Sequence, residues 1–179
     1  MDHIDKVDFQ KVLFRSAMCV MACDGEIHDS EIKEMEIISQ KTPYFDKLDY
    51  LEEIQQIIRA FSNDKKKVVA EYFSKLGEIV LSPVQKLQIL EIVMRIIHAD
   101  NRIDSNEIKF LQIVKSKLAV PDAIFFKRFG EVSYLKGIDE TGKVNFEQDY
   151  LVKKMNLPDF SRIKNKFLKD DIDIDFLSS

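Results

Sequence analysis

The sequence contains few of the residues that interrupt helices. Five glycines and four prolines occur among 179 residues, whereas an average chain of this length has roughly twice as many. Hydrophobic residues make up 45% of the chain, and tryptophan is absent. This composition favours long helical segments over the short, turn-rich strands of an all-β protein. The length suits one domain with its own core, with or without a short tail.

Cysteines and long apolar runs are also scarce. The two cysteines, Cys19 and Cys23, lie four residues apart in an apolar helical pattern. This spacing indicates free thiols in a reducing compartment rather than a disulfide framework. No apolar run approaches the roughly 20 residues needed to cross a bilayer, and the N-terminal Met-Asp-His-Ile-Asp lacks the basic region of a secretory signal. We therefore expect a cytoplasmic protein that does not insert into membranes.

Neither sign of charge dominates the chain. The sequence has 27 Lys and Arg residues against 31 Asp and Glu residues, which gives a net charge of -4. A weakly negative protein is not attracted to nucleic-acid phosphates or to anionic lipids. The charge balance therefore argues against nucleic acid as a partner. The partner that we expect is a protein, or a second copy of the chain in a homodimer.

Hydrophobic periodicity predicts an all-α fold in residues 1–129. Two of the predicted helices, 7–23 and 83–97, are apolar on nearly every side, which is typical of central, buried helices. We expect a bundle of about seven helices. The pattern places them over residues 7–23, 30–40, 48–61, 65–80, 83–97, 105–118 and 121–129.

Residues 130–179 form a C-terminal extension with a less regular pattern. Glycines and turn residues favour loop structure in its first part. The expected elements are a loop over 130–148, or a hairpin of 132–135 with 143–146, and short helices over 149–155 and 160–168.

The last part of the extension is acidic. In residues 170–177 aspartates alternate with isoleucines and a phenylalanine, and no basic residue follows Lys169. This segment is a solvated tail, an edge strand, or a peptide that docks on a partner or on a neighbouring copy.

The strongest internal signal is a repeat of eleven residues. Residues 23–33, Cys-Asp-Gly-Glu-Ile-His-Asp-Ser-Glu-Ile-Lys, align without gaps with residues 99–109, Ala-Asp-Asn-Arg-Ile-Asp-Ser-Asn-Glu-Ile-Lys, 76 positions later. Each copy follows one of the two most apolar helices, so we expect two pseudo-symmetric helix-turn-helix repeats packed through those helices. Gly25 and Asn101 occupy equivalent positions, where the tight turn calls for a positive φ.

Part of the repeat is explained by helix capping. In the second copy, Asp104 at the N-cap and Glu107 three residues later form a capping box. In the first copy His28 is the formal N-cap and a poorer one, and Asp29 or Ser30 could cap the helix instead. Capping therefore accounts for the glutamate of the second copy.

Capping does not explain the aspartate at the end of each buried helix. Asp24 and Asp100 lie where the helix dipole disfavours a carboxylate by about 0.3 to 1 kcal/mol. Backbone amides of the next helix, a basic side chain such as Arg15 or Arg95, or a bound cation would offset this cost.

The pattern Asp-Gly-x-Ile-x-x-x-Glu also matches the second half of a calcium-binding EF-hand loop. The first half lacks oxygen ligands, because Val20 and Ala22 stand where that loop needs them, and a complete EF-hand is excluded. A different site forms if the two halves of the fold meet. It would present the carboxylates of Asp24, Glu31, Asp100 and Glu107, an oxygen-rich set suited to calcium, magnesium or manganese.

At these residues the chain resembles the TerB-like family, the helical domain of tellurite-resistance proteins. The family signature is Ala-Asp-Gly-x-Ile-x-x-x-Glu at a helix-helix turn, present twice, and the resemblance covers about residues 7–129. It implies an all-α bundle whose acidic pairs, proposed in the family to bind metal, lie near the pseudo-symmetry axis, and a stress-response role exercised through partners. Cys23 replaces the usual Ala and Asn101 the usual Gly, and Arg102 beside Asp100 offers a positive charge in place of a metal.

Two classes of function follow. The first is a non-enzymatic binding or scaffold module in a bacterial stress response, with a divalent cation at the paired acidic turns. The alternative is a metal-dependent hydrolase that uses the same carboxylates to activate water. The sequence shows no phosphate-binding loop, nucleophile elbow or His-Glu-x-x-His motif, which favours the first class.

Overall fold

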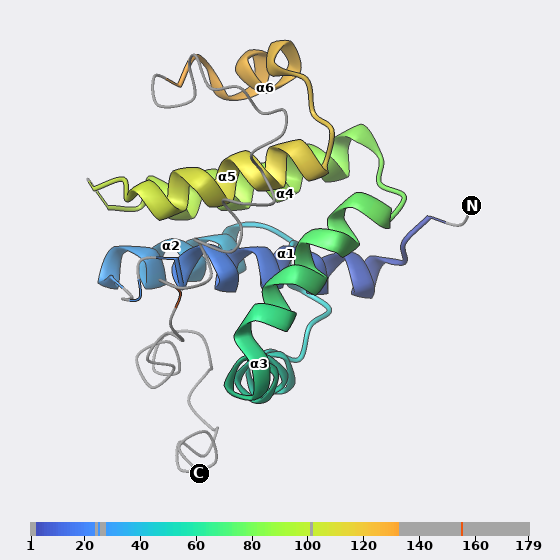
Figure 1. The fold of residues 1–179 in the computed structure, drawn as a ribbon, viewed down its shortest axis with the longest axis vertical. Coiled ribbons are helices and arrows are strands. Elements are labelled where there is room, and N and C mark those ends of the chain that lie inside the picture. The colour runs from blue at the N-terminus through green and yellow to red at the C-terminus, as the bar shows by residue number, and fades with distance from the viewer. Residues whose placement is uncertain (1–2, 24, 26–27, 101, 133–154, 156–179) are drawn as a thin grey trace.

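The computed structural model of the chain describes residues 3–23, 25, 28–100, 102–132 and 155. All regular secondary structure in these residues is helical, which confirms the predicted all-α fold (Figure 1). The elements are α1 (Lys6–Met21), α2 (Asp29–Lys41), α3 (Tyr50–Glu78), α4 (Pro83–Ile97), α5 (Ser105–Lys117) and α6 (Asp122–Phe129).

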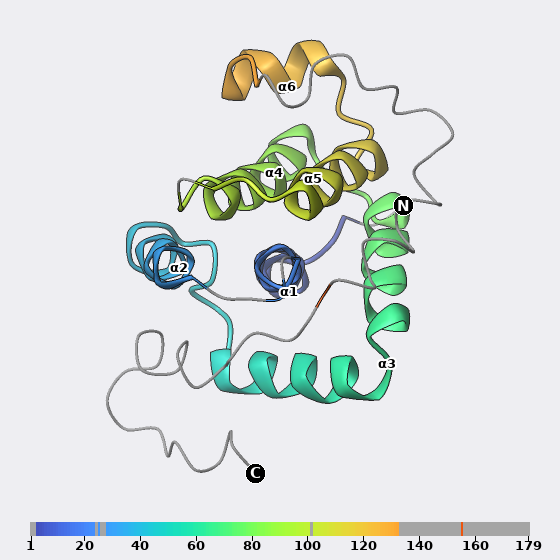
Figure 2. The same ribbon diagram turned by 60° about the vertical axis from the view of Figure 1, so that its left-hand side comes forward.

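The predicted helices over 48–61 and 65–80 are two arms of one bent element, α3, so the described residues hold six helices rather than about seven. The bend lies at Asp64, whose φ of -161° and ψ of 92° are not helical. Its Oδ1 accepts a hydrogen bond from the backbone N–H of Lys67 at 3.0 Å. Asp64 therefore acts as an N-cap for the second arm, and the chain restarts as a helix in a new direction (Figure 2).

The central position of α1 follows from its apolar surface. In Figure 2, α1 is seen nearly end-on, enclosed by α2, the two arms of α3, and the α4/α5 pair. It packs most extensively against α4, the other helix that is apolar nearly all round. Side chains such as Ala17 and Val20 of α1 and Leu90 and Val93 of α4 are completely buried, as the sequence predicts for both helices.

The two predicted helix-turn-helix repeats are present as α1–α2 and α4–α5. The outer helix of each is amphipathic: in α2, Ile32, Met35 and Ile38 are buried while Lys33 is exposed. The α4/α5 pair forms a layer beside α1 and α2, and α6 lies on the far side of that layer (Figure 1). Phe125 anchors α6 because its ring is fully buried.

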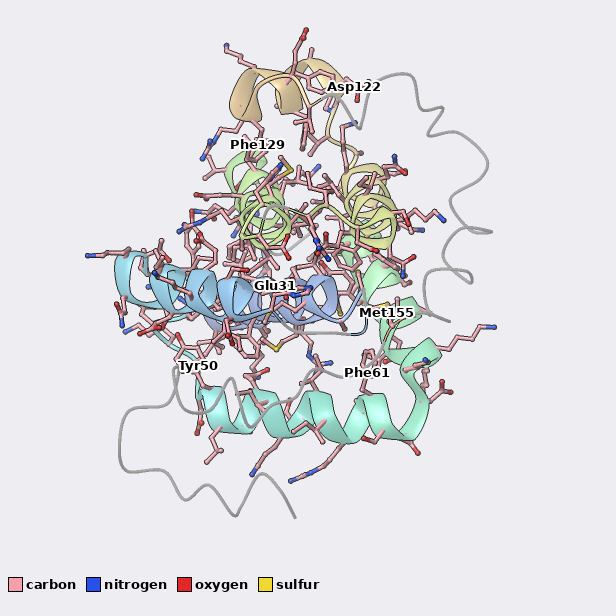
Figure 3. The ribbon with its side chains drawn as sticks, turned by 90° about the vertical axis from the view of Figure 1, so that its left-hand side faces the viewer. Glu31, Tyr50, Phe61, Asp122, Phe129 and Met155 are labelled. Atoms are coloured by element: carbon pink, nitrogen blue, oxygen red, sulfur yellow. The ribbon has the colours of Figure 1, made fainter. Side chains whose placement is uncertain are left out.

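Part of the C-terminal extension contacts the bundle. Val132 and Met155 are buried with the core side chains, and Met155 accepts a hydrogen bond on its carbonyl from Lys65 Nζ at 2.8 Å. Figure 3 shows Met155 beside the bent helix that also carries Phe61. The loop or hairpin expected at 130–148, the helices expected at 149–155 and 160–168, and the acidic segment 170–177 otherwise lie outside the described residues.

Of the helices that the structure describes, none combines the length and the apolar character needed to cross a membrane.

Candidate functional site

The first repeat turn has the backbone that its glycine predicts. After α1 ends at Met21, Gly25 adopts a φ of 81° and donates its N–H to the carbonyl of Ala22 at 3.1 Å. A side chain at this position would be strained in the left-handed region, so glycine suits the turn. Asn101, the equivalent residue of the second copy, lies outside the described residues.

Both glutamates of the repeat make a capping contact, which the sequence predicts for Glu107 and leaves open for the first copy. Glu31 Oε2 accepts the backbone N–H of His28 at 2.9 Å, and Glu107 Oε2 accepts that of Asp104 at 3.0 Å. Asp104 in turn accepts the backbone N–H of Asn106 at 2.7 Å. Glu31 and Glu107 are 1% and 3% exposed, so each carboxylate is buried and holds the start of its helix.

The two turns, 76 positions apart in sequence, meet in space. Asn106 Nδ2, at the start of α5, donates to the carbonyl of Cys23, at the end of the α1 region, at 2.7 Å. His28 Nε2 of the first turn lies 3.7 Å from Asp100 Oδ2 of the second. Glu31 lies where the side chains of α1 and α2 meet those of α4 and α5 (Figure 3). The sequence did not single out Asn106, although it stands inside the repeat.

A backbone amide and an imidazole surround Asp100. Its Oδ1 accepts the backbone N–H of Arg102 at 2.8 Å, and its other oxygen faces His28. Arg102 therefore contributes its amide to this contact. Arg95, another predicted partner, instead donates Nε to Glu34 at 2.6 Å. The compensation that the structure shows for Asp100 is thus one backbone amide of the turn, that of Arg102, which precedes the next helix rather than belonging to it.

The four-carboxylate cation site is a prediction that the described residues do not test. Asp24 lies outside the described residues, and the other three carboxylates come from turns that touch. Among the described residues alone, no cluster of three or more His, Cys, Asp or Glu side chains has the arrangement to hold a metal ion. The predicted set of Asp24, Glu31, Asp100 and Glu107 thus stays a prediction that depends on Asp24.

The two cysteines are packing residues with free thiols, as predicted. Both are buried, and Cys23 Sγ donates to the carbonyl of Cys19 at 3.3 Å. Burial raises the pKa of the Cys19 thiol to about 12. A thiol in this environment stays protonated at neutral pH and is neither nucleophile nor metal ligand.

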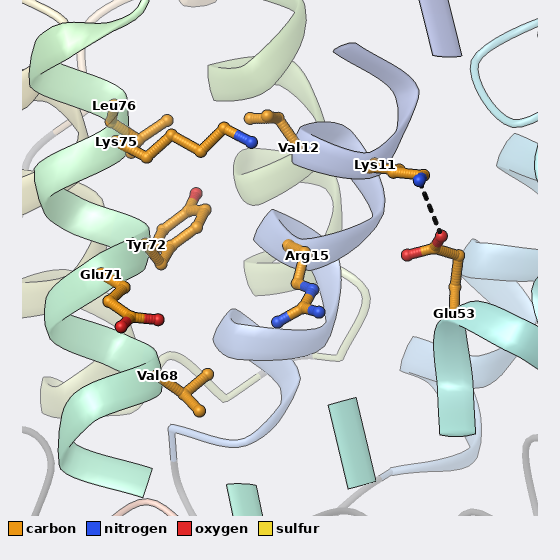
Figure 4. A pocket seen from close by; sticks show the side chains of 9 residues that line it. All are labelled: Lys11, Val12, Arg15, Glu53, Val68, Glu71, Tyr72, Lys75 and Leu76. Carbon is orange, nitrogen blue, oxygen red and sulfur yellow. Dashed lines mark ion pairs between the residues drawn. The ribbon is translucent and has the colours of Figure 1, made fainter. Parts of the chain in front are cut away.

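A second feature, a pocket of about 200 Å³, lies between α1 and the two arms of α3 (Figure 4). The sequence does not reveal it, because its walls come from segments about 40 and 60 residues apart. One signal was present: Lys11 and Arg15 are basic residues four apart on an otherwise apolar helix. The lining residues are Lys11, Val12, Arg15, Glu53, Val68, Glu71, Tyr72, Lys75 and Leu76.

The charges of this pocket do not cancel. Lys11 pairs with Glu53 at 3.9 Å, and the exposed Glu71 pairs with Lys67 at 3.9 Å. Arg15 and Lys75 make no ion pair or side-chain hydrogen bond with any residue that the structure describes. Lys75 extends toward α1 in Figure 4. The lining therefore carries three basic and two acidic side chains. Arg15 and Lys75 make no ion pair with the described residues, although burial raises the pKa of Glu53 and the charges of Lys11 and Arg15 lower it in part.

The pocket wall also contains a buried hydrogen-bonded pair. Ser16 Oγ donates to the carbonyl of Val12 at 2.7 Å, which leaves the Tyr72 hydroxyl as the donor in its 2.5 Å contact with Ser16. Burial raises the pKa of Tyr72 well above its usual value. Tyr72 thus presents a neutral aromatic wall, and the polar chemistry of the pocket comes from Arg15 and Lys75.

Comparisons with known proteins agree with the arrangement of the repeats. A search of curated proteins found no significant match, and a search of solved structures found none either. The model of one protein family, described as tellurite resistance protein TerB, matches residues 13–127. The match spans well over half of the chain and includes both turns. The chain therefore belongs to the TerB family.

Proposed function

We propose that this protein is a non-enzymatic binding or scaffold module of a bacterial stress response related to tellurite resistance, and that it acts in the cytoplasm through a protein partner or as a homodimer. The observation that carries the proposal is the contact between the two repeat turns. A buried amide-carbonyl hydrogen bond and a histidine-aspartate contact join them. The junction links the α1–α2 and α4–α5 repeats, so a ligand there would act on both halves of the bundle.

The ligand proposed for this junction is a divalent cation: calcium, magnesium or manganese. Asp100 is accessible to it, because its side chain is 22% exposed and lies at the edge of the junction. Glu31 and Glu107 already accept backbone N–H groups and would contribute their remaining lone pairs. Asp24 supplies the fourth carboxylate by its place in the repeat. Oxygen ligands of this kind suit hard cations better than zinc or copper.

The role of the cation in this proposal is to tie the two repeats together. It would add an electrostatic link between turns that a hydrogen bond and a histidine-aspartate contact already join. The relative position of α2 and α5 would then depend on the cation, and so would the surface offered to a partner. No chemical step is required, since the carboxylates act as ligands and as helix caps.

Thermal unfolding tests the cation site. The chelated protein should gain about 2.7 kcal/mol in unfolding free energy when calcium, magnesium or manganese is present at a hundred times its dissociation constant. For a chain of this size the gain corresponds to a rise in Tm of roughly 5 to 11 °C. The double variant Asp24→Asn, Asp100→Asn should lose the rise.

Two exposed carboxylates far from the turns give the matched control. The double variant Glu52→Gln, Glu78→Gln should keep the full metal-dependent shift, because both side chains are exposed on α3. If none of the three cations moves the Tm of the unmodified protein, the acidic turns are helix caps and the cation site is absent.

A further inference from the structure

The charged pocket beside α3 calls for an anionic occupant. Arg15 and Lys75 make no ion pair with the described residues, and the lining holds three basic side chains against two acidic ones, while Val12, Val68 and Leu76 give the pocket an apolar floor. An occupant of matching chemistry carries carboxylates next to aliphatic or aromatic side chains. The volume of about 200 Å³ is smaller than the roughly 300 to 1,000 Å³ of typical small-molecule sites. It suits one or two anchoring side chains of a peptide.

The chain itself contains a segment with that chemistry. Residues 171–176 read Asp-Ile-Asp-Ile-Asp-Phe. In an extended backbone, successive side chains point to opposite sides, so the three aspartates would form one edge and the apolar residues the other. With its aspartate edge turned toward the pocket, such a strip can place carboxylates on Arg15 and Lys75, and its apolar residues then lie on the opposite edge.

The described part of the extension leads to this pocket. Met155 is completely buried, and its carbonyl accepts a hydrogen bond from Lys65 at the start of the second arm of α3. Val68, which lines the pocket, is one helical turn further along the same arm. The 16 positions from Met155 to Asp171 span at most roughly 55 Å of extended chain. The acidic segment can therefore reach the pocket of its own molecule, and its tether gives it a high effective concentration there.

We propose that the pocket formed by Lys11, Arg15, Tyr72 and Lys75 is an intramolecular receptor for the acidic segment 170–177. This inference is independent of the cation site, which lies at the repeat turns. Occupation of the pocket by the chain's own segment would compete with an acidic-apolar peptide of a partner, which makes the segment an autoinhibitory element.

Lysine acylation followed by mass spectrometry tests the proposal on the full-length protein. Lys75 is exposed on α3 and should be acylated severalfold more slowly in the unmodified chain than in a variant with Asp171→Asn, Asp173→Asn and Asp175→Asn. Lys41, exposed at the end of α2, is the internal control and should react equally in both. A synthetic peptide of residues 169–179, added to the variant, should restore the protection of Lys75.

Two substitutions of Arg15, one that removes its charge and one that keeps it, test whether the protection of Lys75 depends on the pocket. Arg15→Gln should remove the protection of Lys75, and Arg15→Lys should retain it, with circular dichroism and Tm measured for both. Equal acylation of Lys75 in the unmodified and Asp→Asn chains would overturn the proposal, as would protection that survives Arg15→Gln. The proposal would also be overturned if the protection were lost on dilution over the same concentrations at which a dimer dissociates, because the segment would then come from a second copy.

Discussion

At the scale of single residues, each half of this protein has a buried carboxylate at the start of its outer helix. Glu31 and Glu107 occupy equivalent positions of the repeat and close equivalent helix starts. A buried carboxylate that accepts a backbone N–H offsets its own desolvation and satisfies a donor that the helix leaves open. Glu53 compensates the cost of its desolvation less well, because the nearest basic group lies 3.9 Å from its carboxylate.

Removal of one capping carboxylate should be costly even without any metal. Glu107→Ala leaves the N–H of Asp104 without its acceptor and creates space in the core, so we expect a loss of about 1 to 2 kcal/mol in unfolding free energy. Urea denaturation in the presence of a chelator measures the loss. Glu78→Ala, at an exposed position of α3, should change the free energy by less than about 0.5 kcal/mol. Equal effects of the two changes would contradict the capping role.

The pH dependence of stability should reveal the environment of Glu53. Burial raises the pKa of its carboxyl, and Lys11 and Arg15 counteract that shift only in part. Because the folded-state pKa lies above the unfolded value, Glu53 stabilises the fold below its unfolded pKa, and that contribution is lost as the pH rises through the folded pKa. Glu53→Gln should therefore gain stability relative to the unmodified protein as the pH rises above the ordinary glutamate pKa. Parallel pH profiles of the two proteins would show that Glu53 is unshifted.

At the scale of elements, the bend of α3 creates the pocket. A straight helix of this length could not place both Glu53 and Tyr72 beside α1, whereas the change of direction at Asp64 does so. The residues before the bend, Ser62 and Asn63, have low helix propensity, which explains why the break falls there. The predicted boundary between helices 48–61 and 65–80 was correct. The structure shows it as a bend because the two arms follow each other without a loop.

A change of the capping residue should loosen the second arm of α3. Asp64→Ala removes the acceptor of the Lys67 N–H, and we expect a loss of about 1 kcal/mol. Amide hydrogen exchange should show the loss most clearly in the first turn after the bend. Asp64→Asn keeps a capping side chain and should retain most of the protection. If Asp64→Ala leaves exchange unchanged, core packing alone holds the bend.

At the scale of the whole molecule, the contact between the repeats makes the bundle one unit. Asn106 is completely buried, and its amide donates to the carbonyl of Cys23, so the start of α5 is bonded to the end of the α1 region. Together with the packing of α1 on α4, this contact joins the two pseudo-symmetric halves through the polar turns as well as through apolar side chains. Tellurite-resistance family membership is consistent with this arrangement, since the family match covers both halves.

The polar link between the halves should be measurable. Asn106→Ala leaves the Cys23 carbonyl without this donor inside the fold, and we expect a loss of about 1 to 3 kcal/mol in unfolding free energy. Chemical denaturation measures it, with Asn63→Ala, an exposed amide on α3, as the control. A loss for Asn106→Ala no larger than for Asn63→Ala would assign the coupling of the halves to apolar packing alone.

The sequence by itself determined the local features of this protein: the helical segments, the two central apolar helices, the caps and the repeat. These follow from periodicity and short-range hydrogen bonds, which act between residues a few positions apart. The packing of the helices brings together residues that are distant in sequence: His28 lies beside Asp100, Asn106 bonds to Cys23, and Arg15 and Lys75 line the same pocket. Such contacts depend on the direction in which each helix leaves its turn and on how the apolar faces pack. A pattern of residue types does not specify either quantity.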